Sequence, residues 1–203
     1  MAEAAGDPSG HETAHVGNEA LARLFRLPPE DARTVASLAQ EMLSGSGVDA
    51  TRFFAALDAG EGFGAALGLT PPVLEALYAR AYRWFTVGHP EKAEPLFRAL
   101  CVADPGNADA FVGLGICLRL LGRVDAARLA LDTAARLRPD WAVPTFHLCE
   151  LALACRDDAA AARHLEDFRN RARADTPAAM SAEAARFAQV LALRRRRPEA
   201  AAG

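Results

Sequence analysis

Residues 108–141 read ADAFVGLGICLRLLGRVDAARLALDTAARLRPDW, and a stretch of the same length and pattern lies on either side of them. The three units start at Leu74, Ala108 and Ala142, 34 residues apart. Small and large apolar residues recur at fixed offsets: Ala93, Ala127 and Ala161 at one, and Phe97, Leu131 and Leu165 at another. A fixed period of this length indicates that one structural unit is used three times.

Each unit reads as two helices joined by a short turn. Gly88 and Gly122 lie at this turn in the first two units, where glycine accepts the positive φ of a helix end, and Arg156 takes the same place in the third. Pro105 and Pro139 end the second helix, because proline cannot continue it. These offsets are typical of tetratricopeptide (TPR) helix–turn–helix repeats. We therefore predict an all-α fold in which three TPR repeats stack into a right-handed superhelix.

The offsets also predict which side chains pack. Small residues fall where the two helices of a unit approach each other: Ala81, Gly115 and Cys149 on the first helices, and Ala93, Ala127 and Ala161 on the second. Larger residues fill the layers between helices: Leu77, Trp84, Phe111, Leu114, Leu118, Leu148, Leu165 and Phe168. Pro95 lies inside the second helix of the first unit, where it should bend that helix or delay its start.

The regions flanking the repeats differ from them in composition. Residues 1–28 show no sustained apolar period and are predicted to be disordered or weakly structured. Residues 29–73 form an N-terminal helical region, in which Val35, Leu38, Met42 and Leu43 share one side of the first helix. The repeats then occupy 74–107, 108–141 and 142–175. Residues 176–203 form a C-terminal capping helix and a basic tail; the inward positions of this helix are Met180, Ala184, Phe187, Val190 and Leu191.

Composition narrows the class of protein. The chain is 51% hydrophobic and 24% charged with a net charge of −3, which gives no general attraction to nucleic acid. No apolar run approaches the roughly 18 residues of a membrane span, and the N-terminus lacks the features of a secretory signal. We expect a cytoplasmic protein that does not insert into membranes. The four cysteines, Cys101, Cys117, Cys149 and Cys155, show no C-x-x-C spacing and are expected to be free thiols.

Three local patterns resemble metal-binding, phosphate-binding or catalytic sites, but each has a simpler structural explanation. The stretch from His11 to His15 matches the H-E-x-x-H zinc motif, but it lies near the start of the chain with no core helix and no third ligand. The arginines at 194–197 follow the last helix, where cations are favoured at a helix C-terminus, and phosphate binding is the lesser alternative. His147 and Glu150 share one helix face, which does not make a catalytic site. We expect no enzyme activity, no metal and no cofactor.

The first helix of each TPR unit lines the concave side of the stack, and its free face falls near offsets 5, 9 and 12. These offsets are occupied by Tyr78, Tyr82, Phe85, Val112, Ile116, Arg119, Phe146, Glu150 and Leu153. Because helix stacking uses other offsets, these side chains are expected to be available for an extended peptide with spaced apolar anchors. The alternative is that the N-terminal segment of the chain or a second copy covers them.

Four stretches together resemble one family: LEALY at 74–78, FRALCVAD at 97–104, GLGIC at 113–117 and FHLCE at 146–150. They are similar to the SycD/LcrH family, the class II chaperones of bacterial type III secretion. The resemblance implies a cytosolic chaperone that holds hydrophobic translocator proteins soluble by binding an extended segment with spaced Pro and Leu anchors. The family's groove maps onto Tyr78, Tyr82, Phe85, Val112, Ile116, Arg119, Phe146 and Glu150.

The resemblance also implies a possible homodimer through the N-terminal helices. Pro90 departs from the family pattern, because family members often have Tyr at this place after the first turn. A generic TPR adaptor for another cytosolic partner shares the predicted fold and differs only in its client. A neighbouring gene for a secreted protein with apolar membrane segments would distinguish the two.

Overall fold

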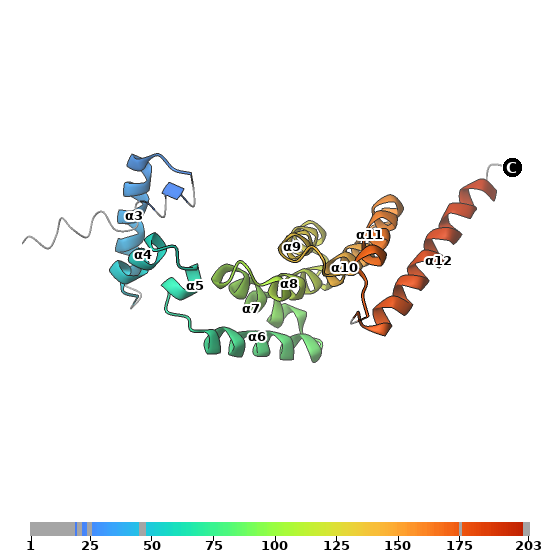
Figure 1. The fold of residues 1–203 in the computed structure, drawn as a ribbon, viewed down its shortest axis with the longest axis horizontal. Helices are drawn as coiled ribbons and strands as arrows, with labels where there is room; N and C mark the ends of the chain where they lie inside the picture. Colours follow the sequence, from blue (N-terminus) through green and yellow to red (C-terminus); the bar gives the residue numbers. More distant parts are fainter. Residues whose placement is uncertain (1–18, 20–21, 24–25, 45–47, 175, 201–203) are drawn as a thin grey trace, which may run out of the picture. The chain divides into compact units, whose positions relative to one another are not determined.

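The computed structural model describes residues 19, 22–23, 26–44, 48–174 and 176–200. Over these residues the chain is helical and contains no strand, as predicted (Figure 1). The helices are α3 (Pro29–Ser44), α4 (Ala50–Asp58), α5 (Phe63–Ala66), α6 (Pro71–Thr86), α7 (Pro90–Ala103), α8 (Ala108–Leu120), α9 (Val124–Leu137), α10 (Val143–Ala154), α11 (Asp158–Arg171) and α12 (Ala178–Ala200).

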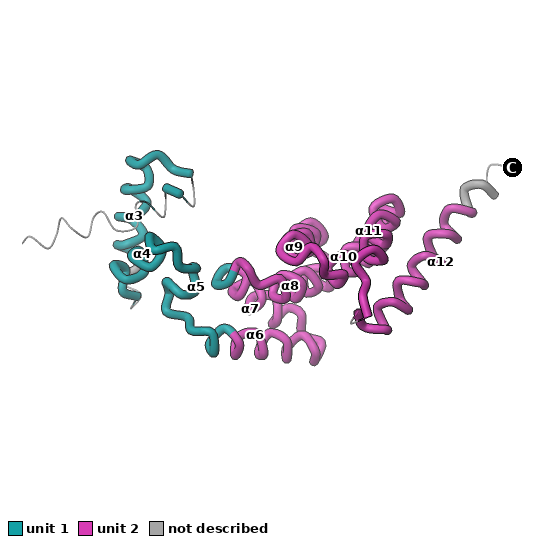
Figure 2. The backbone as a smooth tube through the Cα atoms, in the orientation of Figure 1, with its two compact units in different colours: residues 1–74, 102–104 teal, residues 75–101, 105–203 magenta. Residues whose placement is uncertain are grey.

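The helices belong to two compact units (Figure 2). One contains the chain up to Leu74 together with Val102–Asp104, and the other contains Glu75–Cys101 and the chain from Pro105 onward. The residues at 1–18, where the H-E-x-x-H pattern falls, lie outside the described part of the chain.

The first unit is built on the phenylalanines of α4. Phe53 and Phe54 are buried, and the ring of Phe53 meets that of Phe63 edge-on, with 5.5 Å between centroids. From α3, the buried side chains are Ala32 and Ala36, because small residues let this helix lie close to the α4 rings. The predicted apolar side of α3 points elsewhere: Leu38 is 56% and Met42 80% exposed.

The glycine-rich stretch after α4 is more ordered than its composition indicates. The short helix α5 lies within it. Gly64 on this helix is buried, and a Cβ atom at this position would lie 2.6 Å from the carbonyl oxygen of Ala103. Glycine is therefore required here because the end of α7 approaches so closely.

The second unit contains the helix pairs α6/α7, α8/α9 and α10/α11. The small residues predicted at the approach points are all buried: Ala81, Gly115, Cys149, Ala93, Ala127 and Ala161. At Gly115 a Cβ atom would lie 2.6 Å from Cγ of Leu131, so the α8/α9 pair leaves no room for a side chain at this position. The helix α7 begins at Pro90 and continues through Pro95, so Pro95 does not delay its start.

A buried carboxylate connects the first two pairs. Glu94 on α7 is almost fully buried and accepts a hydrogen bond of 2.9 Å from Nε of Arg98 one turn later. Nη1 of Arg123, which precedes α9, lies 3.9 Å from the same carboxylate. The two arginines compensate the charge that burial would otherwise destabilise.

The turns inside the three pairs share one hydrogen-bond pattern. In the second pair, the amides of Gly122 and Arg123 donate to the carbonyls of Arg119 and Leu118, at 3.0 and 2.9 Å. In the third pair, Arg156 and Asp157 donate in the same way to the carbonyls at 153 and 152. Gly122 has a φ of 74° and Arg156 a φ of 59°, so the arginine adopts the left-handed conformation that glycine adopts in the other repeats.

The C-terminal helix α12 packs on the third pair. Ala184 and Leu191 are buried in the same cluster as Phe146 and Phe168, and Phe187 packs against it. Nη1 of Arg194 lies 2.6 Å from Oδ1 of Asp158, which fixes α12 to the start of α11. The prediction that the arginines at 194–197 follow the last helix is therefore wrong, because they lie within α12 and Arg194 is ion-paired there. Val190, predicted to face inward, is 37% exposed.

Two further features concern membranes and thiols. Among the described residues, no helix combines the length and the apolar character needed to cross a membrane. The four cysteines form no disulfide; Cys101, Cys117 and Cys149 are buried and Cys155 is exposed. Burial raises the pKa of Cys117 and of Cys149 to about 11, so both thiols stay protonated at neutral pH.

Candidate peptide-binding surface

Three aromatic rings follow one face of α6. The rings of Tyr78 and Tyr82 are parallel to within 8° with centroids 6.5 Å apart, and Phe85 continues the row at the same distance from Tyr82. Tyr82 is 54% exposed, while Tyr78 and Phe85 are half-buried. The edge of Tyr78 rests on Phe97 of α7 at 5.7 Å, which fixes the inner end of the row. The first repeat thus presents a continuous aromatic strip that its own helix pair does not cover.

In the second and third repeats the equivalent positions lie deeper. Val112 is 7% and Phe146 6% exposed, so both belong to the core, in contrast to the expectation that helix stacking leaves them free. Phe146 contacts the rings of Phe168 and Phe187, with centroids 5.6 and 5.4 Å away. The physical reason is that α12 adds a layer over α10 and covers Phe146. Ile116 and Leu153 remain half-buried.

The two charged positions meet between α8 and α10. Nη2 of Arg119 lies 3.4 Å from Oε2 of Glu150, and Nδ1 of His147 forms a 2.7 Å hydrogen bond with the same oxygen. Burial alone would raise the pKa of Glu150, but the hydrogen bond from His147 and the charges of His147 and Arg119 outweigh it and lower the pKa. Glu150 is therefore a carboxylate at neutral pH, and the cluster places a fixed polar point among apolar side chains.

Sequence reasoning missed a second ion pair, beside Tyr78. Nη1 of Arg138 lies 3.1 Å from Oδ2 of Asp109, and its guanidinium stacks on the ring of Trp141 at 3.7 Å. Burial, followed by the charge of Asp109, raises the pKa of Tyr78, so its hydroxyl remains a hydrogen-bond donor. The pairing joins offsets 2 and 31 of one repeat, and opposite charges at these two offsets are the only signal of it in the sequence.

The described residues contain no group of three side chains that could hold a metal ion. Glu150 contacts both His147 and Arg119, so the three side chains form an ion cluster.

Comparisons with known proteins agree on the repeat. The tetratricopeptide repeat family model matches residues 85–144. Low calcium response locus protein H from Yersinia pestis is 37% identical over 59 residues, which are 29% of this chain and 35% of that protein. The alignment thus spans about a third of the length of the curated relatives it matches.

Solved structures extend the likeness to the full length of the relatives. The Yersinia enterocolitica chaperone SycD, in complex with a peptide of the translocator YopD, has a TM-score of 0.58 and 26% identity, covering 63% of this chain and 98% of that chain. PcrH from Pseudomonas aeruginosa has also been solved in complex with the chaperone-binding region of PopD. This complex gives a TM-score of 0.59 and 30% identity over 63% of this chain and 97% of that chain. The chain belongs to the TPR chaperones of type III secretion translocators.

Membership in this chaperone family confirms the all-helical TPR fold. It also confirms that the protein is not an enzyme, because TPR secretion chaperones bind and do not catalyse. The part of α6 that carries Tyr82 lies just before the residues matched by the repeat model, and Phe85 is the first residue within them.

Proposed function

We propose that this protein is a type III secretion chaperone that binds an extended segment of a hydrophobic translocator on the first-helix face of its repeats. The observation that carries the proposal is the aromatic strip of Tyr78, Tyr82 and Phe85, which the helix pair leaves uncovered. Complexes of related chaperones support it: SycD was solved with a YopD peptide, and PcrH with the binding regions of PopD and of PopB.

The mechanism is shielding without chemistry. Translocators carry membrane-active segments that would aggregate if they were exposed before secretion. The aromatic strip takes apolar anchors of an extended client segment, while the cluster of Arg119 and Glu150 fixes the position of the segment along the surface. Ordering the segment reduces the affinity, which keeps the client releasable for export.

The contact positions differ in their roles. Tyr78, Tyr82, Phe85, Ile116, Arg119 and Glu150 reach the surface and touch the client directly. Val112 and Phe146 are buried and act from beneath, by supporting the surface at Ile116 and Glu150. The client is a hydrophobic translocator whose segment carries spaced Pro and Leu anchors, and the chaperone works in the bacterial cytoplasm, without nucleic acid or membrane insertion.

A homodimer through α3 forms part of the proposal. Val35, Leu38 and Met42 leave an exposed apolar face on this helix, while its alanines pack inward. A crystal structure of SycD from Yersinia enterocolitica records an alternative dimer. Light scattering of the full chain and of a Leu38→Glu, Met42→Glu variant tests this, and an unchanged mass for the variant would contradict the role of α3.

The proposed surface is tested by co-expression with a hydrophobic translocator from the same genome, followed by affinity capture and titration. The variant is Tyr82→Ala with Phe85→Ala, which spares Tyr78 because its ring supports Phe97. Truncating two aromatic anchors is expected to weaken client binding about tenfold or more. Circular dichroism should show unchanged helical content.

Leu129→Ala is the matched control, since Leu129 is 66% exposed but lies on α9, a second helix. It removes a comparable exposed apolar side chain without touching the proposed surface. If the translocator copurifies equally with the double variant and with wild type, the groove assignment is wrong.

A further inference from the structure

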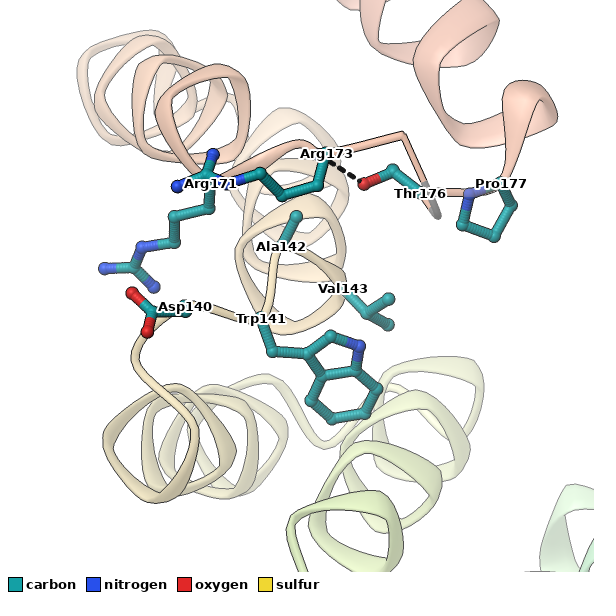
Figure 3. Close-up of a pocket in the computed structure, with 8 residues that line it drawn as sticks. All are labelled: Asp140, Trp141, Ala142, Val143, Arg171, Arg173, Thr176 and Pro177. Carbon is teal, nitrogen blue, oxygen red and sulfur yellow. Dashed lines mark hydrogen bonds between the residues drawn. The ribbon is translucent and has the colours of Figure 1, made fainter.

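A pocket of about 260 Å³ lies at the edge of the third repeat. Two loops build it (Figure 3): one carries Asp140, Trp141 and Val143 into α10, and the other carries Arg171, Arg173 and Thr176 from α11 toward α12. None of these residues belongs to the proposed client surface, and nothing described above gives this pocket a role.

The pocket contains a buried donor without an acceptor. Nη1 of Arg171 is buried and has no hydrogen-bond partner among the described residues. Leaving a charged donor unsatisfied in a buried position is costly, so such a group indicates that an acceptor is missing. In Figure 3 the side chain of Arg171 extends toward the carboxylate of Asp140.

The second arginine is already held in place. Nη1 of Arg173 donates to the carbonyls of Asn170 and Ala172, at 2.9 and 3.1 Å, and its amide donates to Oγ1 of Thr176 at 2.9 Å. These bonds keep its charge at the wall of the pocket. A fixed cation costs less entropy when a ligand binds than a free one does.

The start of α10 adds a third positive element. Its N-cap is Ala142, which provides no side-chain cap, and Pro144 has no N–H, so only the amides of Val143 and Thr145 are left without an intrahelical or side-chain acceptor in the first turn. The positive end of the helix dipole therefore points to the segment that forms one wall of the pocket.

We propose that this pocket binds a carboxylate of a polypeptide partner. Among the lining residues that the structure describes, two arginines and one aspartate leave a net charge of +1, which matches a monovalent anion better than a phosphate dianion. A guanidinium presents a planar pair of donors that fits a carboxylate, and the face of the Trp141 ring that Arg138 does not cover offers an apolar wall for the adjoining chain. The carboxylate comes from an acidic side chain or from a chain terminus.

If Arg171 had only a structural role at the helix end, its replacement would affect the binding of an anion no more than the replacement of another arginine in the same turn. Arginine at the end of α11 is favoured by the helix dipole, and Arg169 in the same turn shares that benefit without lining the pocket. Arg169→Met therefore serves as the matched control for Arg171→Met. Asp140→Asn tests the sign, because removal of a neighbouring negative charge should strengthen the binding of an anion and not weaken it.

The experiment is an NMR titration of the ¹⁵N-labelled full chain at constant ionic strength. N-acetylaspartate amide and N-acetylalanine are added in separate titrations. The indole resonance of Trp141 is observed, and a Trp84→Phe variant assigns it, since the chain has two tryptophans. We expect the Trp141 resonance to shift and to saturate as the probe is added. The affinity for the probe should be about tenfold weaker in Arg171→Met, unchanged in Arg169→Met and higher in Asp140→Asn. Tighter binding of N-acetylaspartate amide would identify an acidic side chain as the source of the carboxylate, and tighter binding of N-acetylalanine would identify a chain terminus.

Three results would each overturn the proposal. One is the absence of any saturable shift of the Trp141 resonance with both probes. Another is an equal shift produced by sodium chloride at the same concentration. The third is an affinity that Arg171→Met and Arg169→Met reduce alike, which would leave only the general charge of the helix end.

Discussion

Replacing Arg156 by glycine should stabilise the protein. Arg156 occupies the left-handed conformation at the turn between α10 and α11, with a φ of 59°. Its backbone amide donates to the carbonyl of Leu153 at 3.2 Å, and this bond survives the substitution because it involves only the main chain. The side chain is exposed, so little packing is lost.

The magnitude follows from two opposing terms. A residue other than glycine pays about 1–2 kcal/mol for the left-handed region. Glycine in turn loses more conformational entropy on folding, roughly 0.5–1 kcal/mol. The difference is a gain of about 0.5–1 kcal/mol, which corresponds to a rise in Tm of roughly 1–4 °C for a chain of this length.

The assay is urea and thermal unfolding followed by tryptophan fluorescence. Both Trp84 and Trp141 lie in the compact unit that contains Arg156, so the signal reports this unit. Gly122→Arg is the mirror-image control, because Gly122 has a φ of 74° at the equivalent turn, and it should lose a similar amount of free energy. Equal stability of wild type, Arg156→Gly and Gly122→Arg would refute the reasoning.

Two other substitutions follow from the packing and the charges. Gly115→Ala places a Cβ 2.6 Å from Cγ of Leu131 and 3.3 Å from the carbonyl of Ala127, so overpacking should cost about 1–3 kcal/mol in urea unfolding, and a neutral result would contradict the close approach of α8 and α9. Glu150→Gln tests the pH dependence of stability. The pKa of Glu150 is lower in the folded state than its ordinary value of 4.5, so its stabilising contribution is complete above that value and is lost as the pH falls through the folded pKa. Wild type should therefore lose more stability than Glu150→Gln between pH 6 and pH 3; parallel acid profiles would count against the ion cluster.

The sequence alone was sufficient for the features that depend on local chemistry. Positive φ at Gly88 and Gly122 and small side chains at Ala93 and Ala127 are requirements of the turn and of the helix contact, so they recur at a fixed period. Helical spacing placed Tyr78, Tyr82 and Phe85 on one face for the same reason.

Depth and long-range pairing were harder to predict. Spacing assigns Val112 and Phe146 to the same face as Tyr82, but their burial depends on the neighbouring helices, and α12 is the helix that covers Phe146. The pocket near Arg171 joins two loops separated by about one repeat, and the sequence carries no periodic signal for it. On α3, the larger apolar residues suggested the buried side, whereas the room available selected Ala32 and Ala36.

The contact of Phe187 on Phe146 makes the C-terminal helix a thermodynamic partner of the client surface. Phe146 supports the surface at Glu150 and also carries α12, which Arg194 fastens at its far end to Asp158. A client that shifts the Phe146 ring must change the free energy of docking α12, and by reciprocity any protein that captures α12 changes client affinity by the same factor. On the proposed function, undocking of the last helix would therefore change the affinity of the chaperone for its client.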